Sequence, residues 1–255
     1  MEILNQQTPR SFRVEDIFLE PTERQPEVLV RYPSQQWGET FEAKSDSFTI
    51  VMNRDLKGSI QMASGMAVFL SKKHPLKNVL LVNTYAGVEL MQRTLALGMK
   101  DAELPMPSSF ARFFPQSEGT PGPNDRLPIF DDSVASPFPF NLRLLDCPMA
   151  TCTTWRLEQE IQLYPSDIVI LNSFEFASLS QWQRGQLAEG LLELRAKFGL
   201  TIVIFSQEMR SDISPYFKGR GALGILSAHA PSVWRIMTAA EQEKWDNLRR
   251  RGIVH

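Results

Sequence analysis

The sequence predicts an α/β fold, a doubly wound and mainly parallel sheet flanked by helices. Short runs that are apolar throughout, such as residues 78–82 and 200–205, are typical of parallel strands covered on both faces. These runs alternate with stretches of helical periodicity such as residues 59–73, and that alternation is the pattern of a parallel sheet. A chain of 255 residues is long enough for one such domain, and no clean boundary divides it.

The two ends of the chain differ in amino-acid composition from its middle. Residues 1–46 are polar and proline-bearing, and we interpret them as an N-terminal extension with a short strand at 28–30 and a loop or edge hairpin at 32–41. The extension either packs on the main domain or forms an arm that reaches a neighbouring subunit, and packing is the favoured interpretation. The main domain is expected over residues 47–240, followed by a basic tail at 241–255.

The main domain begins with a βαβ unit. Residues 48–51 form a short apolar run, and residues 59–73 carry apolar side chains at helical spacing. His74 and Pro75 end this helix, because proline cannot continue a helix and restricts the residue before it. The apolar run at 78–82 then predicts the second strand.

Downstream, a helix is predicted at 88–97, and residues 98–140 form a long insertion rich in proline, serine and aspartate. Insertions of this length are usually functional or mobile, but its phenylalanines indicate that parts of it dock on the domain. The remaining pattern predicts strands at 141–146, 167–171, 200–205 and 232–237, and helices at 153–163 and 179–198, the last closed by Gly199 at a C-cap position.

Composition and charge argue against several classes of protein. The net charge of −2 gives no global attraction to nucleic acid or to an acidic membrane, and no apolar run approaches the ~20 residues that span a bilayer. The N-terminus lacks the apolar segment of a signal peptide, so we expect a cytoplasmic protein. Cys147 and Cys152 have no histidine nearby, and zinc needs about four ligands. We therefore expect no metal site and two half-buried thiols in a reducing compartment.

Several segments match one family in chain order. They are the βαβ unit, NVLLVNTYAGVELMQRTLALG, NLRLLDCPMATCTTWRLEQEI, SDIVILNSF, LTIVIFSQEMR and GRGALGILSAHAPSVWRIM. Together, over residues 48–237, they resemble the RecA-like ATPase family, and within it the motor domain of replicative hexameric helicases and RadA-type proteins. The resemblance implies a P-loop NTPase-type architecture, a phosphate loop at 52–59, ATP and magnesium as cofactors, and side-by-side assembly of subunits.

The phosphate loop departs from the family pattern GxxxxGK[ST], in which glycines free backbone N–H groups for the phosphates and lysine neutralises their charge. Met52 stands where the first glycine is expected, and Asn53 follows it. Lys57 and Gly58 reverse the Gly-Lys pair, and only Ser59 fits. Degeneration of this Walker A motif predicts a nucleotide site that has lost its phosphate cradle.

The residues at other motif positions of the family also differ from the family pattern. Asn172 ends the Walker B strand, where a carboxylate is expected, and an amide is a poorer ligand for magnesium. Tyr85 takes the place of the catalytic glutamate, and a phenol with a pKa of about 10 is a poor base at neutral pH. Glu89 lies one turn further on, and Gln207 matches the sensor glutamine.

We therefore expect no catalysis and no cofactor: a RecA-like pseudo-ATPase that acts as a binding or assembly partner, in DNA replication, recombination or mobile-element processes. Its partner is another protein or a second copy, through RecA-like edges. Two alternatives stay open. One is an atypical ATP-binding ATPase or helicase-like protein that uses magnesium; the other is a different α/β enzyme with its site under the insertion. The working groups of the first alternative are Lys57, Ser59, Glu89, Asp146 and Gln207.

DNA is a further expected partner. Basic residues late in the chain are candidate contacts to DNA or to a protein partner, because family loops near residues 218–224 point towards the DNA channel. The alternative is a solubilising tail. The candidates are Arg210, Lys218, Arg220, Arg235, Arg249, Arg250 and Arg251.

Overall fold

The computed structural model describes residues 27–33, 40–53, 55–114, 127–133, 138–148, 151–172, 181–207, 230 and 232–236. Residues 1–26, the predicted basic tail and the glycine-rich turn near 219–226 lie outside this described part.

A six-stranded sheet with the order β5-β4-β6-β7-β3-β8 organises the described chain, and every strand pair in it is parallel. The central strands β4 and β6 are buried at every residue, as expected for strands covered on both faces. The predicted α/β class is thereby confirmed. The strands are β3 (Phe48–Asn53), β4 (Val79–Asn83), β5 (Leu142–Asp146), β6 (Ile168–Asn172), β7 (Thr201–Gln207) and β8 (Ser232–Ile236).

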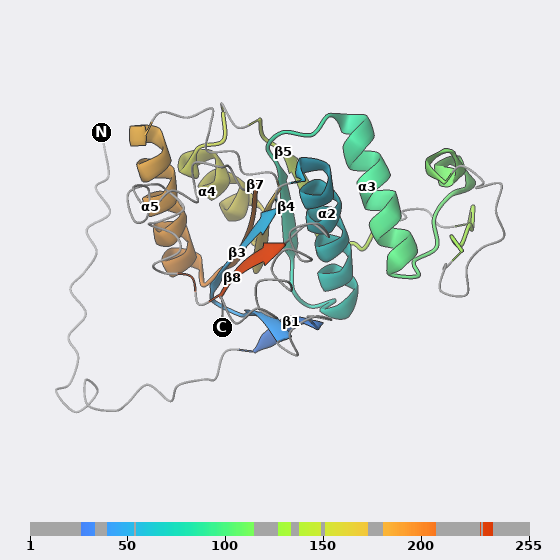
Figure 1. Cartoon of the computed structure of the whole chain (residues 1–255), viewed down its shortest axis with the longest axis horizontal. Coiled ribbons are helices and arrows are strands. Elements are labelled where there is room, and N and C mark those ends of the chain that lie inside the picture. Colours follow the sequence, from blue (N-terminus) through green and yellow to red (C-terminus); the bar gives the residue numbers. More distant parts are fainter. Residues whose placement is uncertain are drawn as a thin grey trace, which may run out of the picture.

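Helices cover the sheet on both sides (Figure 1). On one face lie α2 (Leu56–Lys73) and α3 (Val88–Asp101), and on the other lie α4 (Thr154–Leu163) and α5 (Gln181–Phe198). Two separate apolar clusters fill these layers, one on each face of the sheet. Gly199 ends α5 with φ of 64°, in the left-handed region, which confirms the predicted C-cap glycine. None of the helices in the described ranges is long and apolar enough to cross a membrane.

A two-stranded hairpin packs at the amino-terminal edge of the sheet. Its strands β1 (Val28–Pro33) and β2 (Thr40–Lys44) pair antiparallel, and Leu29 and Ala43 enter the α2–α3 cluster. The predicted strand at 28–30 and the hairpin are therefore confirmed.

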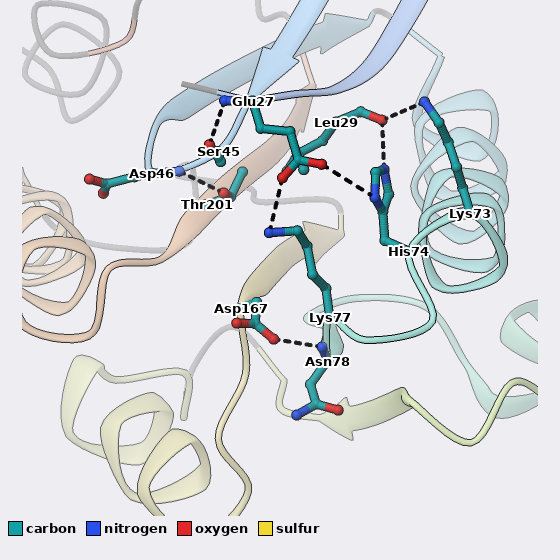
Figure 2. A network of polar contacts seen from close by, with 10 residues as sticks. All are labelled: Glu27, Leu29, Ser45, Asp46, Lys73, His74, Lys77, Asn78, Asp167 and Thr201. Atoms are coloured by element: carbon teal, nitrogen blue, oxygen red, sulfur yellow. Dashed lines mark hydrogen bonds and ion pairs between the residues drawn. The ribbon is translucent and has the colours of Figure 1, made fainter. Parts of the chain in front are cut away.

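Figure 2 shows how polar contacts anchor this hairpin. The Leu29 carbonyl accepts a hydrogen bond from Lys73 Nζ at 3.0 Å and lies 3.0 Å from His74 Nε2. Glu27 forms an ion pair with Lys77 at 3.2 Å. Because Lys73 and His74 end α2, these contacts fix the start of the described chain to the end of that helix.

The insertion predicted at 98–140 is partly ordered in the described ranges. Residues 98–101 complete α3, so the helix extends beyond its predicted end at 97. A 3-10 helix, η1 (Ser108–Phe113), follows, and Phe110 packs edge-on against Phe113 at 5.7 Å between ring centroids. Phe110 and Phe138 also pack against the α2–α3 cluster, so the prediction that parts of the insertion dock on the domain is confirmed, whereas Phe140 is exposed.

Candidate nucleotide site

Polar residues end five neighbouring strands of the sheet. Since carboxyl ends of parallel strands meet at one edge, where α/β proteins bind their ligands, this row marks the candidate site. The register places Asn83 beside both Asp146 and Asn172, and Asn53 beside Gln207. Sequence reasoning missed Asn83. The signal for it was the recurrence of Asn, Asp or Gln after each apolar run.

The connection between β3 and α2 is shorter than predicted. The eight-residue loop expected at 52–59 is wrong, because β3 continues through Asn53 and α2 begins at Leu56. Arg54 and Asp55 alone connect the two elements. A cradle that wraps phosphates needs several consecutive backbone N–H groups outside regular structure, and two residues do not supply them.

The chain's own carboxylate occupies the first turn of α2. Asp55 is the N-cap, and its Oδ1 accepts a hydrogen bond from Lys57 N at 3.1 Å. Its own backbone N–H donates to Asn53 Oδ1 at 3.0 Å. A negative charge at a helix N-terminus is favourable, and here Asp55 provides the charge that a phosphate would otherwise bring.

Gly58 leaves space for the Asp55 side chain that caps the helix. A Cβ added at Gly58 would lie 2.8 Å from Asp55 Oδ2 and 3.2 Å from Asn53 Nδ2. Both side chains therefore fold back over the first turn of α2 and need the absence of a side chain at this position. The glycine makes room for the cap, whereas the family glycine makes room for phosphate.

Three other residues of the predicted loop differ in their burial and surroundings. Ser59 is fully buried, and its hydroxyl has no hydrogen-bond partner within the described ranges. Met52 packs against the cluster on the α4–α5 face, the opposite side of the sheet from α2. Lys57 is exposed. A hydroxyl enclosed in this way is not placed to hold a solvated cation.

Asn172 ends β6 as predicted, and its side chain turns into the protein. The residue is fully buried, and its Nδ2 donates to Met91 Sδ of α3 at 3.3 Å. Its carbonyl accepts from Thr84 Oγ1 at 2.6 Å. This amide stabilises the contact between β6, the turn after β4 and α3.

The turn after β4 is held by Asn83. Its Oδ1 accepts from Ala86 N at 3.0 Å, and its Nδ2 donates to Ala86 O at 2.7 Å and to Asp146 Oδ1 at 2.8 Å. Tyr85 lies in this turn and is 58% exposed, and Glu89 is exposed in the first turn of α3. Asn83 thus fixes the turn, and the phenol of Tyr85 is exposed to solvent.

The structure describes the backbone of Gln207 and Arg235 but not their side chains. Gln207 pairs with Asn53, and Arg235 pairs with Met52 across the β3–β8 register. The other candidate DNA or partner contacts, Arg210, Lys218, Arg220 and Arg249–Arg251, lie outside the described residues and stay predictions. Among the residues that are described, no group of three or more His, Cys, Asp or Glu side chains is placed to hold a metal ion.

The two cysteines flank the turn between β5 and α4. Cys147 and Cys152 are free thiols and are 3% and 4% exposed, so the expectation of half-buried thiols is wrong. They belong to the same buried cluster as Leu157 and Ile161 of α4. Burial, and secondarily the charge and hydrogen bond of Cys147, raise the pKa of Cys152 to about 12.

We expect Cys152 to resist alkylation in the folded protein. With a pKa of about 12, only a small fraction of the thiol, on the order of 10⁻⁴ at pH 8, is the nucleophilic thiolate. The pKa is raised, so the thiol form persists as the pH increases and reactivity stays low up to about pH 10. Iodoacetamide labelling followed by peptide mass spectrometry checks this expectation, with labelling in denaturant as the control. Labelling at equal rates in both states would contradict it.

Comparisons with known proteins give matches among solved structures alone. No family model matches the sequence, and no curated protein matches it. Among solved structures, the chain is similar to a DnaB-like replicative helicase whose structure includes its interactions with primase, with a TM-score of 0.48 and 14% identity. The match covers 79% of this chain and 49% of that one, so the chain spans about half the length of the helicase. The roles of individual residues therefore rest on the geometry described above.

Proposed function

We propose that this protein is a RecA-like protein without ATPase activity, which acts as a binding or assembly partner in DNA replication, recombination or mobile-element processes. One observation carries the proposal: the N-terminus of α2 is already capped by Asp55, from a connection of two residues. The N–H groups at this position are those that hold phosphates in nucleotide-binding βαβ units. A phosphate at this position would be repelled by the negative charge of the Asp55 carboxylate. One backbone N–H of the first helical turn, that of Lys57, already donates to this carboxylate.

Two further contacts support the proposal. The hydroxyl of Ser59 is buried, and the amide of Asn172 is directed to Met91 in the interior. A magnesium ion bound to ATP needs oxygen ligands that reach the carboxyl edge of the sheet. Neither residue offers one there, so the protein is proposed to use neither ATP nor magnesium.

Calorimetric titration of the whole chain with ATP, with and without magnesium, tests the proposal. We expect no binding heat at ATP concentrations up to about 1 mM. This result would exclude a dissociation constant below about 1 mM, which corresponds to a binding free energy of about −4 kcal/mol. An active RecA-like ATPase measured in the same buffer serves as the positive control, and cooperative thermal unfolding shows that the sample is folded. Micromolar affinity would overturn the proposal in favour of the atypical ATPase.

A further inference from the structure

An open apolar groove runs along the outer side of the α2–α3 layer. It has a volume of about 530 Å³ and is lined by α2, by the end of α3 and by β1. Apolar side chains of α2 form much of its wall, and the ring of Phe69 is 42% exposed there. The groove follows α2 from Gly58 to Phe69, which corresponds to roughly 16 Å of helix.

Two glycines form the floor of the groove. Gly65 of α2 and Gly98 of α3 meet where the helices cross, and a Cβ added at Gly98 would lie 3.0 Å from Gly65 Cα. A Cβ added at Gly65 would meet nothing within 4 Å, so this position opens into free space. The missing side chains allow the helices to approach closely and leave a depression above them.

The described chain begins three residues before Val30, which lines this groove. Residues 1–26 precede Glu27, and Val30 and Arg31, a few residues further on, line the groove. Figure 1 shows β1 beneath the lower end of α2. The ion pair of Glu27 with Lys77 and the contact of Leu29 with Lys73 fix this entry point. The first described residues therefore lie near one end of an apolar groove.

We propose that residues 12–19 of the same chain lie in this groove. Their sequence FRVEDIFL is the most apolar stretch of the first 26 residues, and Val14, Ile17 and Phe18 have the i, i+3, i+4 spacing of one helix face. Residues 20–27 span up to about 26 Å when extended, which exceeds the length of the groove. Burial of these apolar side chains against Met62 and Phe69 removes exposed apolar surface from both partners.

Hydrogen–deuterium exchange of the full-length chain tests the proposal. Docking slows exchange of the amides in residues 12–19 by about tenfold or more over an unstructured peptide of the same sequence. Gly65→Leu fills the groove without a clash at Cβ and is expected to abolish this protection. Gly185→Leu is the matched control, because it adds the same side chain to α5, where a Cβ also meets nothing within 4 Å.

Each outcome decides the proposal. Loss of protection in Gly65→Leu but not in Gly185→Leu supports it, provided that protection in the wild type is independent of protein concentration. Fast exchange in the wild type, or slow exchange in all three proteins, overturns it. Protection that grows with concentration overturns it as well, since the groove then belongs to a neighbouring copy's segment. A second variant, Ile17→Ser with Phe18→Ser, changes only residues outside the described part of the chain and is expected to lose protection without any change in thermal unfolding.

Discussion

Replacement of Asn141 by alanine is expected to lower the free energy of unfolding by about 3 kcal/mol. Asn141 is buried where the chain returns from the insertion to β5, and its Nδ2 lies within hydrogen-bond distance of three backbone carbonyls. These are Lys77 O at 2.7 Å, Ser71 O at 3.1 Å and His74 O at 3.2 Å. Alanine leaves these carbonyls, in and just after the last turn of α2, without this donor, and the contact with Ser71 O is buried.

Urea unfolding monitored by circular dichroism measures the loss. Asn78→Ala is the matched control, because Asn78 Nδ2 donates to one carbonyl, Pro165 O at 2.9 Å, and the residue is exposed. We expect the control to cost no more than about 1 kcal/mol. Equal losses in the two variants would show that the Asn141 amide does not hold the end of α2.

Gly190→Ala is expected to destabilise the contact between α4 and α5 by about 2 kcal/mol. A Cβ at Gly190 would lie 2.3 Å from Thr154 Cγ2 and 2.9 Å from Thr154 Cβ. Because the Thr154 Cβ is fixed to the backbone at the start of α4, rotation of the side chain does not relieve the overlap, and the helix has to move. The loss outweighs the gain of about 1 kcal/mol that alanine brings over glycine inside a helix.

Gly185→Ala provides the control on the same helix. A Cβ there meets nothing within 4 Å, so alanine is expected to raise the melting temperature slightly. Thr154→Ser in the Gly190→Ala background removes the nearest atom, Cγ2, and is expected to restore part of the stability. Equal stability of the two alanine variants, measured by thermal unfolding, would contradict the close approach of α4 and α5.

The fold class was predictable because parallel strands buried on both faces appear in the sequence as short, uninterrupted apolar runs. The runs that became β4 and β6 are apolar except for the asparagine that ends each, and the structure buries every residue in them. Helix boundaries were less predictable. The spacing of apolar residues predicts a helix from Ser59, whereas α2 begins at Leu56 because Asp55 caps its first turn.

The sequence predicts where the candidate site lies, but not the direction in which its side chains point. Asn172 was correctly expected at the end of β6, but a strand that is apolar on both faces gives no alternation from which to deduce where its last side chain points. The contact with Met91 decides that direction, and it depends on how α3 packs. Burial of Cys147 and Cys152 depends in the same way on the docking of α4 over their turn.

The short connection between β3 and α2 makes a phosphate loop hard to build at this position by substitution. Glycine at Met52 and lysine at Gly58 would restore the letters of a phosphate loop and leave Arg54 and Asp55 as the whole link. A longer link requires inserted residues or an unwound first helical turn, and unwinding removes the Asp55 cap, which is worth about 1 kcal/mol. Single substitutions towards a phosphate loop are therefore expected to pass through destabilised intermediates.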